Sequence, residues 1–188
     1  FIQVFKYYFS GFIFLFLFSN TFVFSFDTTA KSAILYDETT NSVLFEKFAD
    51  KPLPPASMSK LMTLLLTFEA LEEKRISLST KFRVSEKASK KGGSTMFLEK
   101  SQLVSVEDLI KGISVVSGND ACIVIAEGLN GTEESFVERM NLKAKDLGLS
   151  NSNFHNSTGW PSPGHYMSVR DLLTIATILK NEYPNYYK

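Results

Sequence analysis

The chain has 188 residues, of which 44% are hydrophobic and 21% are charged, and its 20 Lys and Arg residues balance its 20 Asp and Glu residues. This length and hydrophobicity suit one globular domain with a buried core and argue against intrinsic disorder. Balanced charge without a dense basic run argues against a nucleic-acid partner. A single Cys excludes an intramolecular disulfide, and with only two His it also excludes a CxxC site or a His-rich metal cluster.

The first 26 residues form an apolar N-terminal segment. Lys6 is the only charged side chain between Phe1 and Phe26, and an apolar run from Phe9 to Phe18 follows it. A short basic region before an apolar run predicts an export signal over residues 1–26, cleaved near Ser25, ahead of a mature protein over residues 27–188. An uncleaved membrane anchor is the alternative, because the segment approaches the roughly 20 residues of a spanning helix.

The next part of the chain predicts a small β-element and a central helix. Two β-prone runs, residues 33–36 and 43–46, flank polar turn residues and predict a hairpin. After a proline-rich stretch, residues 57–71 carry apolar side chains over most of a helical circumference, which predicts a centrally buried helix. Residues 75–103 are polar and broken by two adjacent glycines, so we expect loops with short strands or turns there.

Further helices follow, each with a local start or stop signal. Apolar periodicity and capping residues place them over residues 105–116, 120–129, 133–147 and 168–180. Ser105, Thr132 and Ser168 are the expected N-caps. A sheet of only two strands rarely stands alone, and the chain starts with Phe rather than Met, so we expect a fragment whose remaining strands lie beyond residue 188.

Ser57 and Lys60 form the first candidate chemical pair. Residues three apart on a helix share a face, so Ser57 Oγ and Lys60 Nζ can meet. A serine hydroxyl needs a neighbouring base to act as a nucleophile, and Lys60 is a base only if its ordinary pKa of about 10.4 is lowered. Burial in an apolar helix, near the positive end of the helix dipole, would lower it. The Ser57 backbone N–H would supply half of an oxyanion hole. The alternative is a chance S-x-x-K match with Ser57 as a helix cap.

A second candidate constellation, Ser117-Gly118-Asn119-Asp120, joins two predicted helices. Gly118 permits a tight turn that points the Ser117 hydroxyl and the Asn119 amide the same way. Such a pair can relay a proton and hold a substrate amide. The alternative is an ordinary joint between helices, with Asn119 or Asp120 as the N-cap. The two motifs together are more specific than either one alone.

Together, these motifs resemble those of the penicillin-recognising serine enzymes, and most closely the low-molecular-mass D-alanyl-D-alanine carboxypeptidases. The resemblance continues in the family's order over nearly all of the chain after the apolar N-terminus. Its stretches are residues 55–60, 93–98, 104–112, 117–122, 147–149, 156–160 and 168–172. It implies a β-lactamase/transpeptidase-like α/β fold of the α+β type, with a helical subdomain packed on an antiparallel sheet.

The resemblance also implies a role for each motif residue. Ser57 would be the acylated nucleophile, Lys60 its proton acceptor, Ser117 a proton relay and Asn119 a substrate-binding residue. The partners would be peptidoglycan stem peptides ending in D-Ala-D-Ala and β-lactam antibiotics, with no metal and no organic cofactor. The protein would act in the bacterial periplasm or at the outer face of the cytoplasmic membrane. A missing C-terminus would be the route to any association with the membrane surface.

The family's third motif, K-T-G on a sheet strand, does not occur in this chain. Truncation before that motif is our interpretation, and the chain as given is therefore expected to be inactive. A serine β-lactamase is one alternative, but class A enzymes deacylate with a glutamate, and residues 151–158 hold no acidic side chain. A non-catalytic cell-wall-binding protein of the same fold is the other alternative, and the intact motif residues count against it.

The remaining candidates are interpreted as structural. His155 and His165 lie in a loop rich in Gly, Pro and Ser, and we expect surface or loop-packing roles for them rather than a base or ligand pair. Cys122 is expected to be a small buried residue rather than a reactive thiol. A solvated face, with cell-wall contact as the alternative, is expected for three lysines: Lys87, Lys90 and Lys91.

Overall fold

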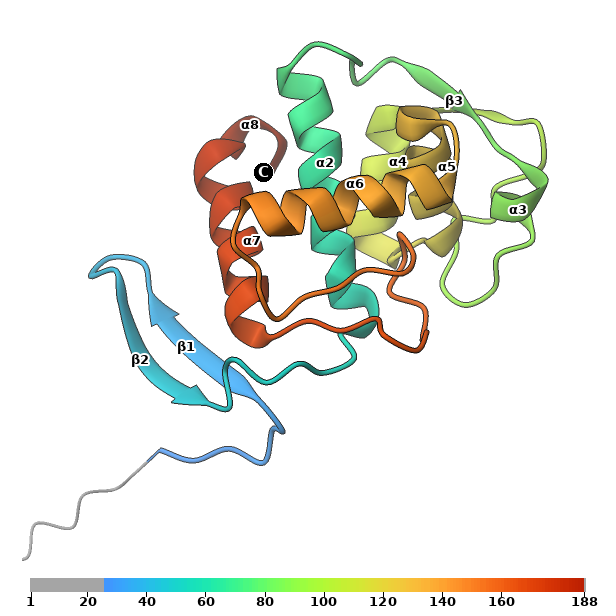
Figure 1. Cartoon of the computed structure of the whole chain (residues 1–188). Coiled ribbons are helices and arrows are strands. Elements are labelled where there is room, and N and C mark those ends of the chain that lie inside the picture. The colour runs from blue at the N-terminus through green and yellow to red at the C-terminus, as the bar shows by residue number, and fades with distance from the viewer. Residues whose placement is uncertain (1–25, 188) are drawn as a thin grey trace, which may run out of the picture.

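The structure is a computed structural model that describes residues 26–187. The export signal expected over residues 1–26 therefore lies, apart from Phe26, outside the described residues. Within residues 26–187, no helix combines the length and the apolar character needed to cross a bilayer. Figure 1 shows a helical body with a β-hairpin at its edge, in agreement with the predicted α+β class.

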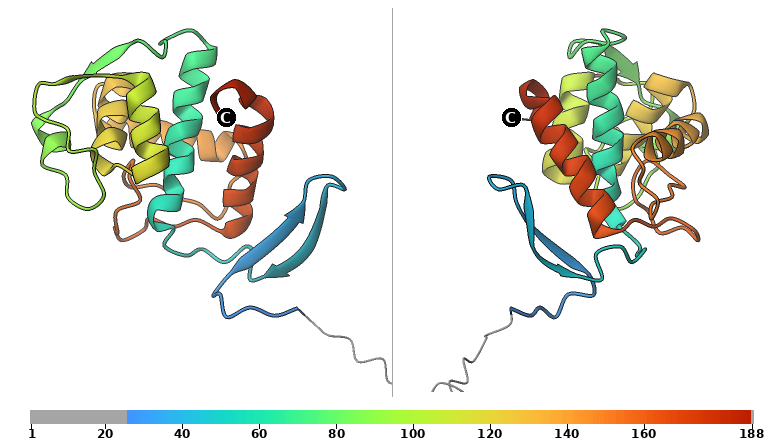
Figure 2. Two further views of the ribbon diagram at one scale, coloured as in Figure 1. Left: turned by 180° about the vertical axis from the view of Figure 1, so that it is seen from behind. Right: turned by 60° about the vertical axis from the view of Figure 1, so that its left-hand side comes forward.

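The hairpin is built from β1 (Ala33–Asp37) and β2 (Ser42–Lys47), which pair antiparallel. The register shifts between Leu35 and Tyr36, and Asn41 takes a left-handed φ of 55° in the turn. Asparagine tolerates this conformation, so the turn suits its sequence. The predicted hairpin is confirmed, and it lies beside the start of α7 (Val169–Glu182) (Figures 1 and 2).

The predicted central helix consists of two parts, a 3-10 turn η1 (Ala56–Ser59) and α2 (Lys60–Glu72). Ala56 has a φ of 49°, so regular α-helical geometry cannot extend back through it. The single α-helix predicted from residue 57 is therefore wrong over its first turn and correct beyond it. Nearly all side chains of α2 are buried and most of them are apolar, and Figure 2 shows the helix between α7 and the other long helices. Each buried Leu or Met contributes roughly 1.5–3 kcal/mol to folding.

The polar stretch after α2 contains short elements, as expected. An antiparallel pair is formed by β3 (Lys81–Arg83) and β4 (Leu103–Ser105). Between them lies one helical turn that the sequence did not predict, α3 (Glu86–Ser89), whose start is capped by Ser85 accepting from the Ala88 N–H at 3.0 Å. Residues 90–102 form loops, which cross toward the junction of the next two helices.

The longer helices agree with the predicted ranges to within two residues. They are α4 (Val106–Val116), α5 (Asn119–Asn130), α6 (Glu133–Asp146) and α7, followed by the short α8 (Pro184–Tyr187). Ser105, Thr132 and Ser168 each accept a hydrogen bond at 3.1 Å from the backbone N–H three residues on. The three predicted N-caps are thus confirmed. These helices surround α2 and bring its N-terminal end beside the α4–α5 junction.

Candidate active site

Ser57 and Lys60 meet at the junction of η1 and α2. Lys60 Nζ lies 3.0 Å from Ser57 Oγ, so the predicted contact across three residues is present. The two side chains differ in environment, because Ser57 is exposed whereas Lys60 is only 4% exposed. The pair therefore joins a hydroxyl that a substrate can reach to an amine shielded from water.

Two carbonyl oxygens complete the surroundings of the Lys60 amine. Its Nζ donates to Asn119 Oδ1 at 2.8 Å and to the backbone carbonyl of Thr158 at 2.7 Å. No carboxylate among residues 26–187 pairs with it. Burial lowers the pKa of Lys60 below its ordinary value, and the nearby positive charge of Lys91 adds to the effect. The nearby Cys122 thiol does not counteract the lowered pKa of Lys60. Burial raises the pKa of this thiol to about 12, so it carries no negative charge at neutral pH.

The three oxygen neighbours of Lys60 Nζ match the three donors of an ammonium, and the same geometry also accommodates a neutral amine. A neutral lysine has two N–H donors and one lone pair, whereas an ammonium has three donors and no lone pair. The carbonyl oxygens of Asn119 and Thr158 can only accept, so they use the two donors. The lone pair is then left for the remaining neighbour, Ser57 Oγ. In this state Lys60 can accept the Ser57 proton.

The predicted turn at Ser117-Gly118-Asn119 is present, but its geometry differs from expectation. The left-handed residue is Ser117, with φ 57° and ψ 38°, and not Gly118. Gly118 lies in a crowded place, because a Cβ there would lie 3.1 Å from Asp120 Oδ1 and 3.3 Å from the Gly112 carbonyl oxygen. The prediction that Gly118 supplies the backbone freedom is wrong, and close packing favours a small residue there.

Ser117 and Asn119 are positioned differently by this turn. Asn119 is held on both sides, since its Oδ1 accepts from Lys60 and its Nδ2 donates to the Gly92 carbonyl at 2.9 Å. Ser117 Oγ is buried and has no hydrogen-bond partner within residues 26–187. A buried hydroxyl without a partner is costly and retains its full hydrogen-bonding capacity. Ser57, Lys60 and Asn119 are thus joined by direct contacts, and Ser117 is not.

Asp120 is a buried residue whose contacts the sequence did not predict. Neither Asn119 nor Asp120 is the N-cap of α5, a position that Gly118 occupies. Instead, the Asp120 carboxylate accepts from the backbone N–H groups of Met96 and Leu98 at 3.0 and 3.1 Å. It thereby fixes the loop ahead of β4 against the start of α5. The Asn119 backbone N–H adds to this junction by donating to the Ser94 carbonyl at 2.7 Å.

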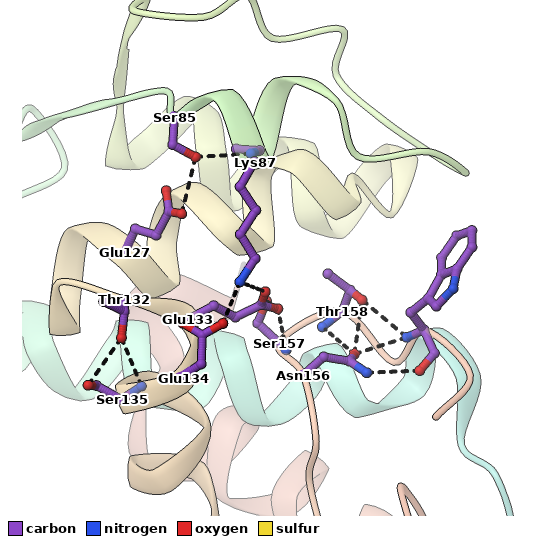
Figure 3. A network of polar contacts seen from close by, with 12 residues as sticks. Ser85, Lys87, Glu127, Thr132, Glu133, Glu134, Ser135, Asn156, Ser157 and Thr158 are labelled. Atoms are coloured by element: carbon purple, nitrogen blue, oxygen red, sulfur yellow. Dashed lines mark hydrogen bonds and ion pairs between the residues drawn. The ribbon is translucent and has the colours of Figure 1, made fainter. Parts of the chain in front are cut away.

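The carbonyl of Thr158 is held in place by a polar network in the loop before α7 (Figure 3). Asn156 Oδ1 accepts from the backbone N–H groups of Thr158, Gly159 and Trp160 at 2.8–3.1 Å. Close packing requires Gly159, because a Cβ there would lie 1.8 Å from the Ala56 carbonyl oxygen. The loop therefore lies directly against η1, next to the nucleophile candidate.

Glu133 anchors the same loop from α6. Its Oε1 accepts from both the N–H and the Oγ of Ser157, and its Oε2 pairs with Lys87 at 2.9 Å. Figure 3 shows Lys87 reaching from α3 to Glu133 and Glu134. Burial opposes ionisation of Glu133, but the bonds from Lys87 and Ser157 outweigh it and lower the pKa of this carboxyl. Glu133 is an ionised structural residue with both oxygens occupied.

The other candidates have the structural roles that the sequence indicated. His165 is buried and packs edge-on against Phe154, with its Nδ1 accepting from the His155 N–H at 3.4 Å. Burial, with a smaller contribution from His155, lowers the pKa of His165 to about 4, so its ring is neutral at pH 7. Cys122 is fully buried, as predicted.

The expected solvated lysine face is only partly present. Lys90 is exposed and pairs with Glu86 four residues earlier. Lys87 instead binds the buried Glu133, and the Lys91 ammonium lies 4.5 Å from the centre of the Trp160 ring. Lys87 and Lys91 therefore contact acidic or aromatic side chains from distant segments, whereas the partner of Lys90 is local.

Comparison with known proteins shows which family this chain belongs to. The family model described as D-alanyl-D-alanine carboxypeptidase matches residues 20–188. The D-alanyl-D-alanine carboxypeptidase DacF of Bacillus subtilis is 47% identical over 154 residues, which cover 81% of this chain and 40% of that protein. The crystal structure of the D-alanyl-D-alanine carboxypeptidase DacD of Francisella tularensis superposes with a TM-score of 0.84 at 34% identity, covering 87% of this chain and 40% of the other.

A second similar structure was solved with an antibiotic bound. Penicillin-binding protein D2 of Listeria monocytogenes, in its ampicillin-bound form, has a TM-score of 0.75 at 28% identity and covers 86% of this chain and 65% of its own. The chain belongs to the D-alanyl-D-alanine carboxypeptidase family and has the fold of its penicillin-binding members. It spans 40% of the length of the Bacillus relative.

Proposed function

We propose that the protein is a serine-type D-Ala-D-Ala carboxypeptidase that removes the terminal D-Ala from peptidoglycan stem peptides through an acyl-enzyme on Ser57. The proposal is carried by the 3.0 Å contact between the exposed Ser57 hydroxyl and the buried Lys60 amine. Membership of the D-alanyl-D-alanine carboxypeptidase family supports the choice of substrate.

The first half-reaction transfers the acyl group to serine. Lys60 Nζ takes the Ser57 Oγ proton while Oγ attacks the carbonyl carbon of the D-Ala-D-Ala bond. The Ser57 backbone N–H donates to the oxyanion that develops, and the Asn119 amide orients the substrate. Ser117 relays a proton from Lys60 to the nitrogen of the terminal D-Ala, so the C–N bond breaks and D-Ala leaves as an amine. The unpartnered Ser117 hydroxyl supports this role.

The second half-reaction hydrolyses the ester. Lys60, neutral again after giving up its proton, takes a proton from water while the water oxygen attacks the ester carbon. The bond between that carbon and Ser57 Oγ then breaks, and Oγ regains a proton from Lys60. Atoms and charges balance with water as the only co-substrate, and the chain's own side chains move every proton.

β-Lactams are proposed as covalent inhibitors at the same serine. Their strained amide resembles the D-Ala-D-Ala terminus, so the attack by Ser57 Oγ opens the ring and leaves an ester. The ampicillin-bound form of the Listeria penicillin-binding protein supports this reaction for the fold. Glu133 has both oxygens occupied by Ser157 and Lys87, which disfavours its use as a base for rapid release of the drug.

Action on the cell wall requires export, so we propose that residues 1–26 direct the chain out of the cytoplasm as an N-terminal signal. N-terminal sequencing of the exported protein tests this directly. A new N-terminus close to residue 27 is the expected result. An N-terminus that retains the apolar run would instead support the uncleaved anchor.

The catalytic proposal is tested with the full-length natural protein. We expect fluorescent penicillin to form a covalent adduct, seen by intact mass, and a pentapeptide ending in D-Ala-D-Ala to release D-Ala. Ser57→Ala should abolish both, because the attacking oxygen is removed. Ser59→Ala is the matched control, since the buried Ser59 Oγ donates to the Ala56 carbonyl and does not contact Lys60. A folded wild-type protein that forms no adduct would leave a non-catalytic wall-binding role.

A further inference from the structure

Lys91 occupies an unusual position at the rim of the site. Its Nζ lies 4.5 Å from the centre of the Trp160 ring, and the indole is 45% exposed. A cation over an indole face is attracted by the electron density of the ring. The main chain that carries the indole is fixed, because the backbone N–H of Trp160 donates to Asn156 Oδ1 and to Thr158 Oγ1 at 3.0 and 3.1 Å. The ammonium therefore lies over an aromatic ring that projects from a well-held turn.

Lys91 also differs from its lysine neighbours in its partners. Lys87 pairs with Glu133 and Glu134, and Lys90 and Lys100 both pair with Glu86. No carboxylate within residues 26–187 pairs with Lys91. Each of these three lysines is thus neutralised by a carboxylate. Lys91 alone among the four keeps a positive charge without a counterion within residues 26–187.

This charge lies beside the reacting groups. The Gly92 carbonyl accepts from Asn119 Nδ2, so the residue after Lys91 contacts the candidate substrate-binding amide. A Cβ on Gly93 would lie 2.7 Å from Asn119 Nδ2 and 2.9 Å from Trp160 Cζ3, so this segment is wedged between the two side chains. In keeping with this position, burial lowers the pKa of Lys60 and the positive charge of Lys91 adds a smaller lowering.

An apolar groove continues from Trp160 along the outside of η1. It has a volume of about 310 Å³ and is lined by Pro54, Pro55, Ala56, Trp160, Pro161 and His165, among others. The groove shares Ala56, the residue before the nucleophile candidate, with η1, and it shares Trp160 with the Lys91 contact. It therefore lies near both and offers an apolar surface for the part of a peptide upstream of the cleaved bond.

We propose that Lys91, seated on the Trp160 indole, binds a carboxylate that the donor peptide carries upstream of the cleaved bond and thereby selects acidic stem peptides. This inference rests on the proposed carboxypeptidase function. An unpaired ammonium at a partly desolvated rim forms a charge-assisted hydrogen bond to a carboxylate, whereas a carboxamide at the same place gains much less.

The test compares two synthetic peptides that both end in D-Ala-D-Ala. One carries a γ-linked glutamate with a free α-carboxylate upstream, and the other carries the corresponding carboxamide. We expect the wild-type protein to prefer the acidic peptide by about tenfold in kcat/KM. In Lys91→Met the ratio should fall to about one, because the charge is gone while the length of the side chain remains. The ratio cancels any general effect of Lys91 on Lys60.

Lys90→Met is the matched control, because Lys90 is adjacent, exposed and paired with Glu86. Its ratio should equal that of the wild type. If Lys91→Met kept the wild-type ratio of kcat/KM for the two peptides, the inference would be overturned. An equal loss of kcat/KM for both peptides is one such result, and it would indicate that Lys91 acts on the terminal carboxylate or on Lys60. Penicillin adducts on Ser57 are measured in all three proteins. Absence of an adduct in the wild type would count against the proposed function. If all three proteins form adducts normally, the ratio measured for Lys91→Met tests the role of Lys91 alone.

Discussion

The helical body and the β1–β2 hairpin are held together in different ways. In the body, polar side chains such as Lys60, Asp120 and Glu133 are buried and make several directed contacts each. The hairpin leaves Leu35 and Leu44 exposed, at 50% and 61%. It is tied to α7 by exposed ion pairs from Arg170 and Lys180.

This difference indicates which contacts make the site rigid. Breaking a buried polar contact is costly, because the remaining partner cannot hydrogen-bond to water. An exposed ion pair contributes little to the free energy of unfolding. Lys60 and Asn119, the side chains joined most directly to Ser57, make contacts of the first kind. The geometry of the site should therefore respond strongly to substitutions in the body and weakly to substitutions that loosen the hairpin.

Replacing Asp120 should have the largest effect on stability. Asp120→Ala leaves the part-buried N–H of Met96 and the buried N–H of Leu98 without their acceptor, so we expect a loss of about 3 kcal/mol, measured by urea denaturation. Penicillin acylation should slow as well, because the loop that holds Asn119 loosens. Asp108→Ala is a matched control, since Asp108 is exposed. Equal losses in the two variants would contradict the special role assigned to Asp120.

Acidification should destabilise the body through His165 by a smaller amount. Its pKa is about 4 in the folded protein against an ordinary 6.5, so the unfolded chain binds more protons between these values. Stability is then fully present above pH 6.5 and is lost as the pH falls toward 4, by about 2 kcal/mol at pH 4.5. Urea denaturation at pH 7 and 4.5 measures the loss. His165→Gln should reduce it, and an undiminished loss in that variant would assign the effect to other groups.

The smallest effect is expected at the hairpin. Arg170→Met removes the exposed pairs to Glu46 and Asp50, at 2.6 and 2.7 Å. Because these groups remain solvated, we expect the urea midpoint and the penicillin acylation rate to stay close to the wild-type values. A clear drop in acylation would show that the position of the hairpin affects the site, and the contrast between the two regions would then fail.

The sequence predicted features that depend on neighbouring residues. The N-caps Ser105, Thr132 and Ser168 act over three residues, and the Ser57–Lys60 contact also spans three. Such contacts follow from helical geometry alone. The hairpin was likewise predictable from two β-prone runs around one polar turn.

Contacts between distant segments could not be predicted in this way. The Thr158 carbonyl that binds Lys60 comes from 98 residues further along the chain, and no local pattern marks it. The same holds for Asp120 with Met96 and for Lys91 with Trp160. At Ser117 the local rule failed, because the left-handed residue of the turn is this serine and not the adjacent glycine.

The most direct test of the mechanism is the pKa of Lys60 itself. Protein labelled with ¹³C at the lysine Cε is titrated by NMR, and Lys60→Met identifies the resonance by its absence. We predict a pKa clearly below the ordinary 10.5, with penicillin acylation rising as the pH increases through the same midpoint, because the neutral amine is the base. A Lys60 resonance that titrates at 10.5, with acylation already complete well below that pH, would contradict the account.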